Sequence, residues 1–199
     1  MIKRLFYKSV YKSDDVYPMD DNLSKVLNTH RTEVYDNISN VTSNDTYVLN
    51  SLLCSDLKSW LHGHLVKFFY DYYKIDKEVK LYITQSWLNF TENGEHHHHH
   101  NHPNSIISGV FYFTGEDLEL RFHNDQDLFK GFSFNINEYK EDNSDTYTIK
   151  FSSGQLVLFP SHMKHDVPKF KGNLRVSLAF NTFIKGDIGS LPGLTRVEI

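Results

Sequence analysis

The spacing of apolar residues changes from a helical period to a strand period near residue 78. Residues 53–72 carry apolar side chains at intervals of three and four, which predicts a helix buried along one face, with Asn50 or Ser51 as its N-cap. A shorter helix is predicted over 22–31, where Leu23, Val26 and Leu27 have helical spacing. The N-terminal part of the chain therefore supplies helices.

From residue 79 onward, the chain has the pattern of short strands whose ends are marked by Gly, Asn, Asp and Pro. An edge strand is also predicted within 2–12. The other predicted strands are 79–91, 105–114, 118–122, 131–136, 146–151, 154–159 and 175–183. The histidine-rich stretch before residue 105 and the segment 165–169 join the sheet only by inference. Together these segments give about the eight strands of a jelly roll of the cupin type.

This division predicts one domain over residues 1–199, mainly β with N-terminal α-helices. Residues 1–78 provide a strand and helical support, 79–185 the jelly-roll core, and 186–199 a C-terminal tail. The segment 36–50 is rich in Asn, Ser, Thr and Asp, and is predicted to be a long surface loop.

Composition excludes some function classes. The formal net charge is -4, with 25 acidic and 21 basic side chains, so no basic surface for nucleic acid is expected. The one cysteine, Cys54, cannot form an intramolecular disulfide, which favours a reducing compartment, and its leucine neighbours predict a core position. No apolar run approaches the ~20 residues of a membrane span, and the N-terminus lacks the pattern of a signal peptide. We therefore expect a cytoplasmic protein without a membrane contact.

Six histidines stand between Gly94 and Ser105, in the sequence Gly-Glu-His-His-His-His-His-Asn-His-Pro-Asn-Ser. Imidazole is the commonest neutral metal ligand near neutral pH, so the stretch predicts a metal site. In a regular strand, the even-numbered histidines 96–102 would share one face, and the odd-numbered pair 97 and 99 would share the other. His165 follows a distant predicted strand and is the expected third ligand.

The ligand pair within the stretch has three possible registers, 96/98, 98/100 and 100/102. We prefer His100 and His102, because Pro103 ends strand pairing there, and keep His98 and His100 as the alternative. Two other interpretations are an internal affinity tag and a low-complexity metal-sequestering tract. Neither of these requires His165.

A second chemical feature lies ten positions after His165. Arg175 opens an apolar strand and shares a strand face with Ser177. A guanidinium inside a barrel needs an anion, and its planar fork matches a carboxylate, so the pair predicts a carboxylate clamp rather than a surface ion pair. Asn89 shares a predicted strand face with Trp87 and is a candidate contact for the same ligand. Arg121 and His123 are instead expected on a solvated face.

With these pieces, the sequence resembles the iron(II)- and 2-oxoglutarate-dependent dioxygenases, particularly a group of short oxygenases found in tailed phages and marine bacteria. The resemblance covers about residues 80 to 185. It depends on several short motifs: Trp87-Leu-Asn89, His100-x-His-Pro-Asn-Ser105, Ser108-Gly-Val-Phe-Tyr112, Leu158-Phe-Pro-Ser161, His165-x-Val167 and Arg175-x-Ser177.

The resemblance implies a double-stranded β-helix and specific residue roles. It implies that His100 and His165 bind Fe(II), that Arg175 and Ser177 hold the far carboxylate of 2-oxoglutarate, and that Tyr112 is a further cosubstrate contact. The implied reaction couples oxidative decarboxylation of 2-oxoglutarate to oxidation of a substrate C–H bond. The prime substrate and the oligomeric state, monomer or homodimer, are not encoded in any motif. A phage-encoded protein would act in the host cytoplasm.

The sequence departs from the superfamily at His102, where most members have a carboxylate. Three neutral imidazoles leave the metal centre one charge more positive, which makes zinc and nickel stronger competitors for the site. The short phage and marine group has the same His-x-His pattern. The alternative interpretation is a cupin-like metal-binding or interaction protein that has three histidine ligands and no turnover.

Overall fold

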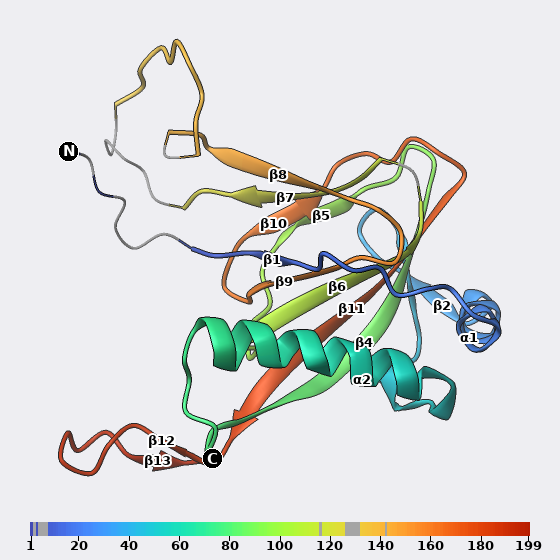
Figure 1. Ribbon diagram of the computed structural model, residues 1–199. Coiled ribbons are helices and arrows are strands. Elements are labelled where there is room, and N and C mark those ends of the chain that lie inside the picture. Colours follow the sequence, from blue (N-terminus) through green and yellow to red (C-terminus); the bar gives the residue numbers. More distant parts are fainter. Residues whose placement is uncertain (2, 4–7, 116, 126–131, 142) are drawn as a thin grey trace.

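Two antiparallel sheets face each other in this computed structural model, which describes residues 1, 3, 8–115, 117–125, 132–141 and 143–199 (Figure 1). The larger sheet has the order β1-β9-β6-β11-β4-β3-β2, and the smaller sheet has the order β5-β10-β7-β8. The strands of the larger sheet are β1 (Tyr11–Lys12), β2 (Val34–Asp36), β3 (Val41–Ser43), β4 (Lys80–Glu92), β6 (Ile107–Thr114), β9 (Leu156–Pro160) and β11 (Leu174–Lys185). Those of the smaller sheet are β5 (His97–His100), β7 (Leu118–His123), β8 (Thr146–Phe151) and β10 (His165–Val167). This is the predicted jelly roll.

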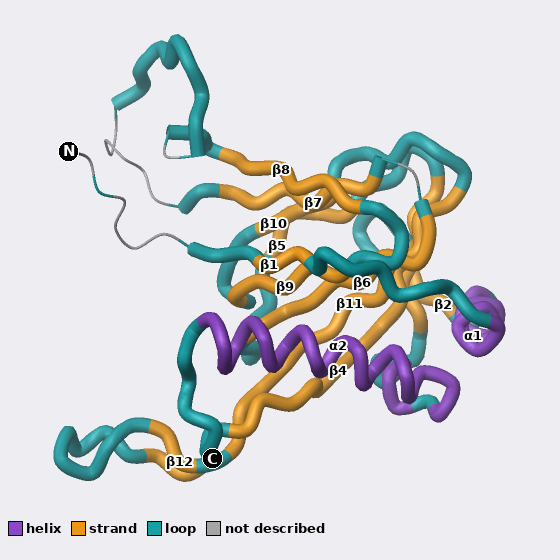
Figure 2. Tube along the Cα trace, in the orientation of Figure 1, coloured by secondary structure: helices purple, strands orange, loops and turns teal. Residues whose placement is uncertain are grey.

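Helices cover the outer face of the larger sheet (Figure 2). The helix α2 (Ser55–Val66) crosses that face and continues into the π-helical segment η3 (Lys67–Tyr72), while α1 (Asp21–Arg31) packs beside it. Two short 3-10 segments, η1 (Val48–Asn50) and η2 (Leu52–Cys54), lead into α2. As predicted, Ser51 caps this helical region: its side chain accepts a hydrogen bond from the Leu53 amide at 3.3 Å. Cys54 is buried there, and burial raises the pKa of its thiol to about 11.

Two apolar cores result from this layering. One lies between the helices and the larger sheet, and the other lies between the two sheets, where Tyr112, Phe122 and Phe159 are buried. The central strand β6 is therefore buried on both faces, which explains its nearly continuous apolar sequence. The C-terminal residues form a separate ribbon of β12 (Asp187–Ile188) and β13 (Val197–Glu198).

Two predicted segments differ in the structure. The strand prediction at 131–136 is wrong for 132–136, which form no strand; residue 131 is outside the described part of the chain. Phe132 and Phe134 alternate as in a strand, but both side chains are exposed. The edge-strand prediction for 2–12 holds at Tyr11–Lys12, and its residues 2 and 4–7 also lie outside the described part.

The prediction of a surface loop at 36–50 is wrong over much of its length. This segment contains β3 and η1, and three of its polar side chains, Asn40, Thr42 and Ser43, are buried. Ser43 Oγ accepts a hydrogen bond from the Leu88 amide at 3.0 Å, and the Leu49 amide donates to Ser86 Oγ at 2.9 Å. The polar residues therefore satisfy the backbone and side chains of this sheet edge instead of facing water.

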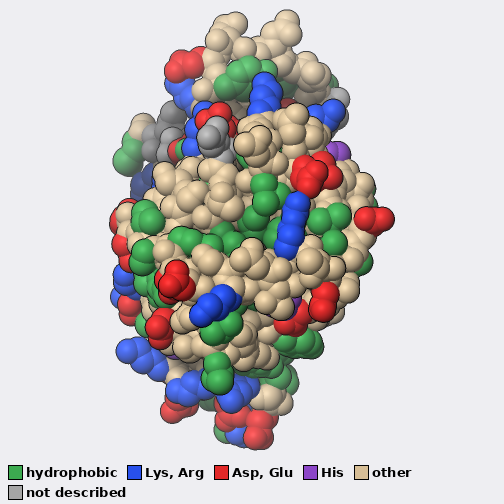
Figure 3. All heavy atoms as spheres, turned by 90° about the vertical axis from the view of Figure 1, so that its right-hand side faces the viewer, with side chains coloured by type: hydrophobic (Ala, Val, Ile, Leu, Met, Phe, Trp, Pro, Cys, Tyr) green, Lys and Arg blue, Asp and Glu red, His purple; other side chains and the backbone are tan. Residues whose placement is uncertain are grey.

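Charges of both signs are mixed on one face of the molecule. On the face shown in Figure 3, acidic and basic side chains are interspersed among apolar and neutral polar ones. Among the helices that the structure describes, none has the length and apolarity needed to span a bilayer.

Candidate metal and cosubstrate site

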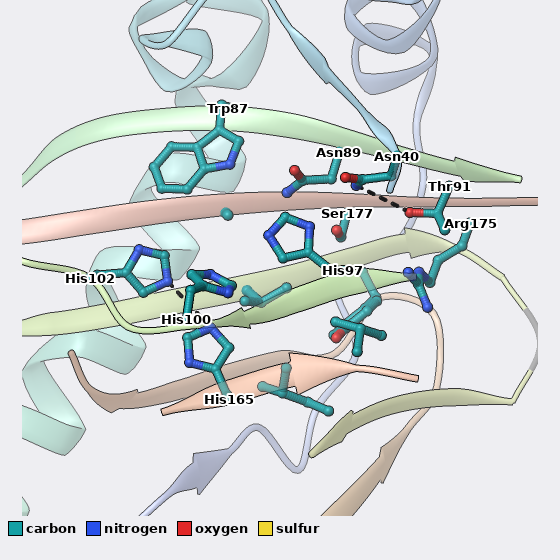
Figure 4. Close-up of a pocket in the computed structure, with 15 residues that line it drawn as sticks. Asn40, Trp87, Asn89, Thr91, His97, His100, His102, His165, Arg175 and Ser177 are labelled. Carbon is teal, nitrogen blue, oxygen red and sulfur yellow. Dashed lines mark hydrogen bonds between the residues drawn. The ribbon is translucent and has the colours of Figure 1, made fainter. Parts of the chain in front are cut away.

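A pocket opens between the two sheets, and its lining comes from alternate residues of several strands (Figure 4). Because side chains alternate between the faces of a strand, residues two apart enter the same pocket. The lining residues are Asn40, Trp87, Asn89, Thr91, His97, His100, His102, Val110, Tyr112, Leu120, His165, Val167, Arg175, Ser177 and Ala179.

Three of the predicted ligands meet at one end of the pocket. Ligand nitrogens of His100, His102 and His165 all lie within 4.8 Å of one another. The Nε2 atoms of His102 and His165 are 3.4 Å apart. Two nitrogens bound to one ion at about 2.1 Å, at angles of 90–109°, are about 3.0–3.4 Å apart, so this separation suits a shared ion.

Hydrogen bonds to backbone carbonyls set the tautomers of two of these rings. His100 Nδ1 lies 2.8 Å from the His98 carbonyl oxygen, and His165 Nδ1 lies 3.0 Å from that of Met163. A carbonyl oxygen can only accept, so Nδ1 carries the proton in both rings. In the neutral rings, Nε2 is then the bare nitrogen, which is the form that binds a metal.

Burial keeps these imidazoles neutral. Loss of hydration lowers the pKa of His102 to about 4 and that of His165 to about 2, and the neighbouring imidazoles act in the same direction. Burial also lowers the pKa of His100. Near neutral pH, no proton therefore has to be displaced from the metal-facing nitrogens.

The predicted alternation of the histidine stretch is wrong at His97. This residue was assigned to the face opposite His100, yet both line the pocket. A register shift explains the difference: His165 pairs with His100 while Val167 pairs with His97, so β5 has one residue more than β10 over the same length. This bulge turns His97 inward. His98, the alternative ligand, groups with His97 and His100 and not with His165.

The other end of the pocket contains an arginine with no anionic partner. Arg175 is 4% exposed, and among the described residues no carboxylate pairs with it. Its guanidinium carbon lies 5.3 Å from the centre of the Phe170 ring, and burial lowers its pKa. A buried cation without a counter-ion is costly, so this group is suited to an anionic ligand.

The other predicted cosubstrate contacts form one row beside this arginine. Ser177 on β11 lies directly opposite Asn89 on β4 and opposite Tyr112 on β6. The Tyr112 hydroxyl is buried and finds no hydrogen-bond partner in the described structure. Burial raises its pKa to about 12, so it remains a neutral hydrogen-bond donor.

The sequence analysis missed three polar residues of the lining: Asn40, Thr91 and His97. Thr91 follows from the period of two that begins at Trp87 and Asn89. Asn40 gives no local signal, because it enters the pocket only through the pairing of β3 with β4; its amide donates to Thr91 Oγ1 at 3.5 Å. His97 depends on the bulge.

The prediction that Arg121 and His123 are solvated is only partly correct. Their side chains are 40% and 24% exposed, and neither lines the pocket. Both bind the carboxylate of Asp166 on the outer face of the smaller sheet.

A family model matches the region that contains most of this pocket. Residues 85–181 match the model of a family described as "Putative 2OG-Fe(II) oxygenase". No curated protein matches the sequence. The matched region contains all the lining residues except Asn40.

Solved structures share the fold at low sequence identity. An oxidoreductase of the 2OG-Fe(II) oxygenase family from Burkholderia pseudomallei has a TM-score of 0.59 and 12% identity, over 87% of this chain and 83% of the other. HygX from Streptomyces hygroscopicus, solved with nickel, 2-oxoglutarate and hygromycin B, has a TM-score of 0.58 and 11% identity, over 88% and 82%. A Pseudomonas putida prolyl-4-hydroxylase has a TM-score of 0.55 and 12% identity, over 87% and 92%.

These matches confirm the predicted double-stranded β-helix. The narrower resemblance to a phage and marine-bacterial group stays a prediction. Residues 85–181 therefore match the family of 2OG-Fe(II) oxygenases that the model describes, and the chain as a whole has the fold of solved 2OG-Fe(II) oxygenases.

Proposed function

We propose that this protein is an Fe(II)- and 2-oxoglutarate-dependent oxygenase that hydroxylates a C–H bond of its substrate. The observation that carries the proposal is the pairing of two features in one pocket. Three neutral imidazoles converge at one end, and the buried, unpaired Arg175 occupies the other (Figure 4). A 2-oxo diacid is complementary to this pocket: its keto acid end can chelate a metal held by the imidazoles, and its distant carboxylate can bind Arg175.

His100, His102 and His165 would hold the metal. Three imidazoles are a donor set that Fe(II) accepts, and they would leave positions on the ion for the keto acid. Bound iron(II) supplies the redox chemistry, in which one O2 oxidises both 2-oxoglutarate, to succinate and CO2, and the substrate R–H, to R–OH. The hydrogen bonds that His100 Nδ1 and His165 Nδ1 donate to backbone carbonyl oxygens fix the orientation of the two rings toward the metal position.

At the opposite end, Arg175 would bind the far carboxylate in two-point geometry. The Tyr112 hydroxyl lacks a partner in the described structure and would donate a further hydrogen bond. Ser177 and Asn89 share a row with Tyr112 and would complete the polar lining. These groups orient the cosubstrate and exclude water from the pocket.

His97 stands along the length of the cosubstrate path. Figure 4 shows its ring between the three-histidine cluster and the end of the pocket that contains Ser177 and Arg175. Burial, together with the neighbouring imidazoles and Arg175, lowers its pKa to about 3, so the ring adds no charge. We infer that His97 packs against the carbon chain of the bound 2-oxo acid.

The third imidazole supports a second candidate function. A three-histidine set with no carboxylate also suits zinc and nickel, so the chain could hold such an ion without turnover. This alternative accounts for the histidines, but it gives no role to the buried Arg175 or to the unpartnered Tyr112 hydroxyl. The oxygenase proposal accounts for all of them.

The deciding experiment measures succinate released from 2-oxoglutarate by metal-free protein reloaded with Fe(II) and ascorbate. We expect slow release without a prime substrate, and its loss in Arg175→Met and His165→Ala. Arg121→Met is the matched arginine control, because Arg121 lies outside the pocket. Tight metal binding with neither 2-oxoglutarate binding nor succinate release in the wild type would favour the non-catalytic alternative.

A His102→Asp variant tests the unusual ligand directly. It restores the carboxylate that most of the superfamily has at this position and lowers the charge of the centre by one. If three-histidine iron is slow only for electrostatic reasons, uncoupled succinate release should rise in this variant. His96→Asp is the control, because His96 belongs to none of the histidine sets.

A further inference from the structure

A second set of metal-ligand side chains lies on the outer face of the smaller sheet. His99, Asp166 and His123 belong to β5, β10 and β7, three strands that run side by side (Figure 1). Their ligand atoms all lie within 4.8 Å of one another. The set consists of two imidazoles and one carboxylate, and it is separate from the pocket lining.

Strand alternation explains why this set forms. On β10, His165 points into the pocket, so its neighbour Asp166 points to the opposite face. On β5, His99 likewise points away from the pocket that His100 lines. The outer set therefore uses a histidine of the tract that the pocket does not use.

The carboxylate at the centre of this set is firmly held. Asp166 is 6% exposed, and one of its oxygens accepts a hydrogen bond from His123 Nε2 at 2.5 Å. Arg121 donates to both carboxylate oxygens at 3.0–3.3 Å. The His99 and His123 ring centres are 4.2 Å apart, which brings the third donor close.

We propose that His99, His123 and Asp166 form a second binding site for a divalent ion such as Zn²⁺, Ni²⁺ or Co²⁺. Two imidazoles and one carboxylate are a donor set that these ions accept, with water in the remaining positions. The ion would replace the proton between His123 Nε2 and Asp166. The N···O separation would then widen from 2.5 Å to about 2.9–3.4 Å, which requires only a small movement of the His123 ring.

Arg121 would remain bound to the carboxylate and orient it, as hydrogen-bonded partners of ligating carboxylates do. His99 is exposed, so ions reach this site directly from solvent, whereas the pocket histidines are at least partly buried. The two sites are back to back on the same strands. They should therefore differ in exchange rate as well as in ligand type.

The test is the number of Zn²⁺ or Ni²⁺ ions bound per full-length chain, measured by equilibrium dialysis and elemental analysis. We expect two ions in the wild type and one in His99→Ala/His123→Gln. Gln at 123 can still donate to Asp166, so the variant should keep its fold. The matched control is His96→Ala/His162→Ala, which removes two histidines outside both sets and should still bind two ions.

A complementary variant separates the two sites. His102→Ala/His165→Ala should keep one ion, and its Co²⁺ absorption spectrum should be that of the outer site alone. A His102→Ala/His165→Ala variant that binds no ion, or a His99→Ala/His123→Gln variant that binds as many ions as the wild type, would show that Asp166, Arg121 and His123 are only an ion-pair cluster. Succinate release plays no part in the count, so failure of the oxygenase proposal would leave this result interpretable.

Discussion

Substitution of Arg175 by Met should have opposite effects on cosubstrate binding and on folding stability. Arg175 is buried and forms no salt bridge with the described residues, so in the cosubstrate-free protein it is a desolvated cation that contacts the Phe170 ring and is favoured by Glu95 only at longer range. Burial of an ion lowers the folding stability by several kcal/mol, and a desolvated cation–π contact offsets about 2 kcal/mol of that cost. Met fills a similar volume without that cost. We therefore expect a gain of about 1–3 kcal/mol in the free energy of unfolding.

For the cosubstrate, the same substitution removes two charge-assisted hydrogen bonds. Each is worth about 1.5–3 kcal/mol, so the loss is about 3–6 kcal/mol, or about 10²–10⁴-fold in Kd. Binding of 2-oxoglutarate to the Ni²⁺-loaded protein can be measured by calorimetry in the absence of turnover. The stability gain should appear in thermal unfolding as a rise of about 2–4 °C per kcal/mol.

The matched control is Arg121→Met. It removes the two-point partner of the buried Asp166 and should lower the free energy of unfolding by about 1–3 kcal/mol, while 2-oxoglutarate still binds. Our reasoning would be refuted if Arg175→Met strongly destabilised the protein and left cosubstrate affinity unchanged. That result would mean that Arg175 is a structural residue with a partner in the folded chain.

Four further predictions follow from the structure. His165→Ala should abolish binding of one metal ion, measured by elemental analysis, because it removes one of three converging nitrogens. The metal-free protein should lose stability below pH 6.5: the unfolded chain binds protons there, whereas His102 and His165, with folded pKa values of about 4 and about 2, do not. Well below pH 6.5, this effect should approach about 1.4 kcal/mol per ring and pH unit in urea unfolding, and it should fade as the pH rises through 6.5 to about 8. Tyr112→Phe should weaken 2-oxoglutarate binding by about 1 kcal/mol in the same calorimetry, without loss of stability, because the hydroxyl has no partner in the described structure. Gly109→Ala should lower the unfolding free energy by about 1–3 kcal/mol, since its Cβ would lie 2.2 Å from the Phe180 ring.

Local patterns predicted much of this protein. The period of three to four residues located the helical region that becomes η2, α2 and η3, and the period of two located most of the strands of both sheets. The spacing of His100, His102, His165 and Arg175 also predicted residues that the structure brings into one pocket. The predictions of helices and strands succeeded because burial of one face of an element imposes a period that is visible in the sequence.

The residue positions that the sequence did not predict depend on contacts between distant segments. The bulge that turns His97 inward exists only because β5 pairs with β10, and five consecutive histidines carry no mark of its position. Asn40 reaches the pocket only through the pairing of β3 with β4, and its polar surroundings resembled a solvated loop. Asp166 becomes a potential metal ligand only when three strands place it between His99 and His123.

The sequence by itself determined most of the types of element, the imidazole donors and the presence of an arginine on a core strand, because these follow from residue type and local period. The tertiary structure alone decided which histidines share a pocket, which polar groups there lack partners, and which ligands converge on the outer face. The physical reason is that strand pairing sets the facing direction of every residue, and a one-residue shift in register reverses it.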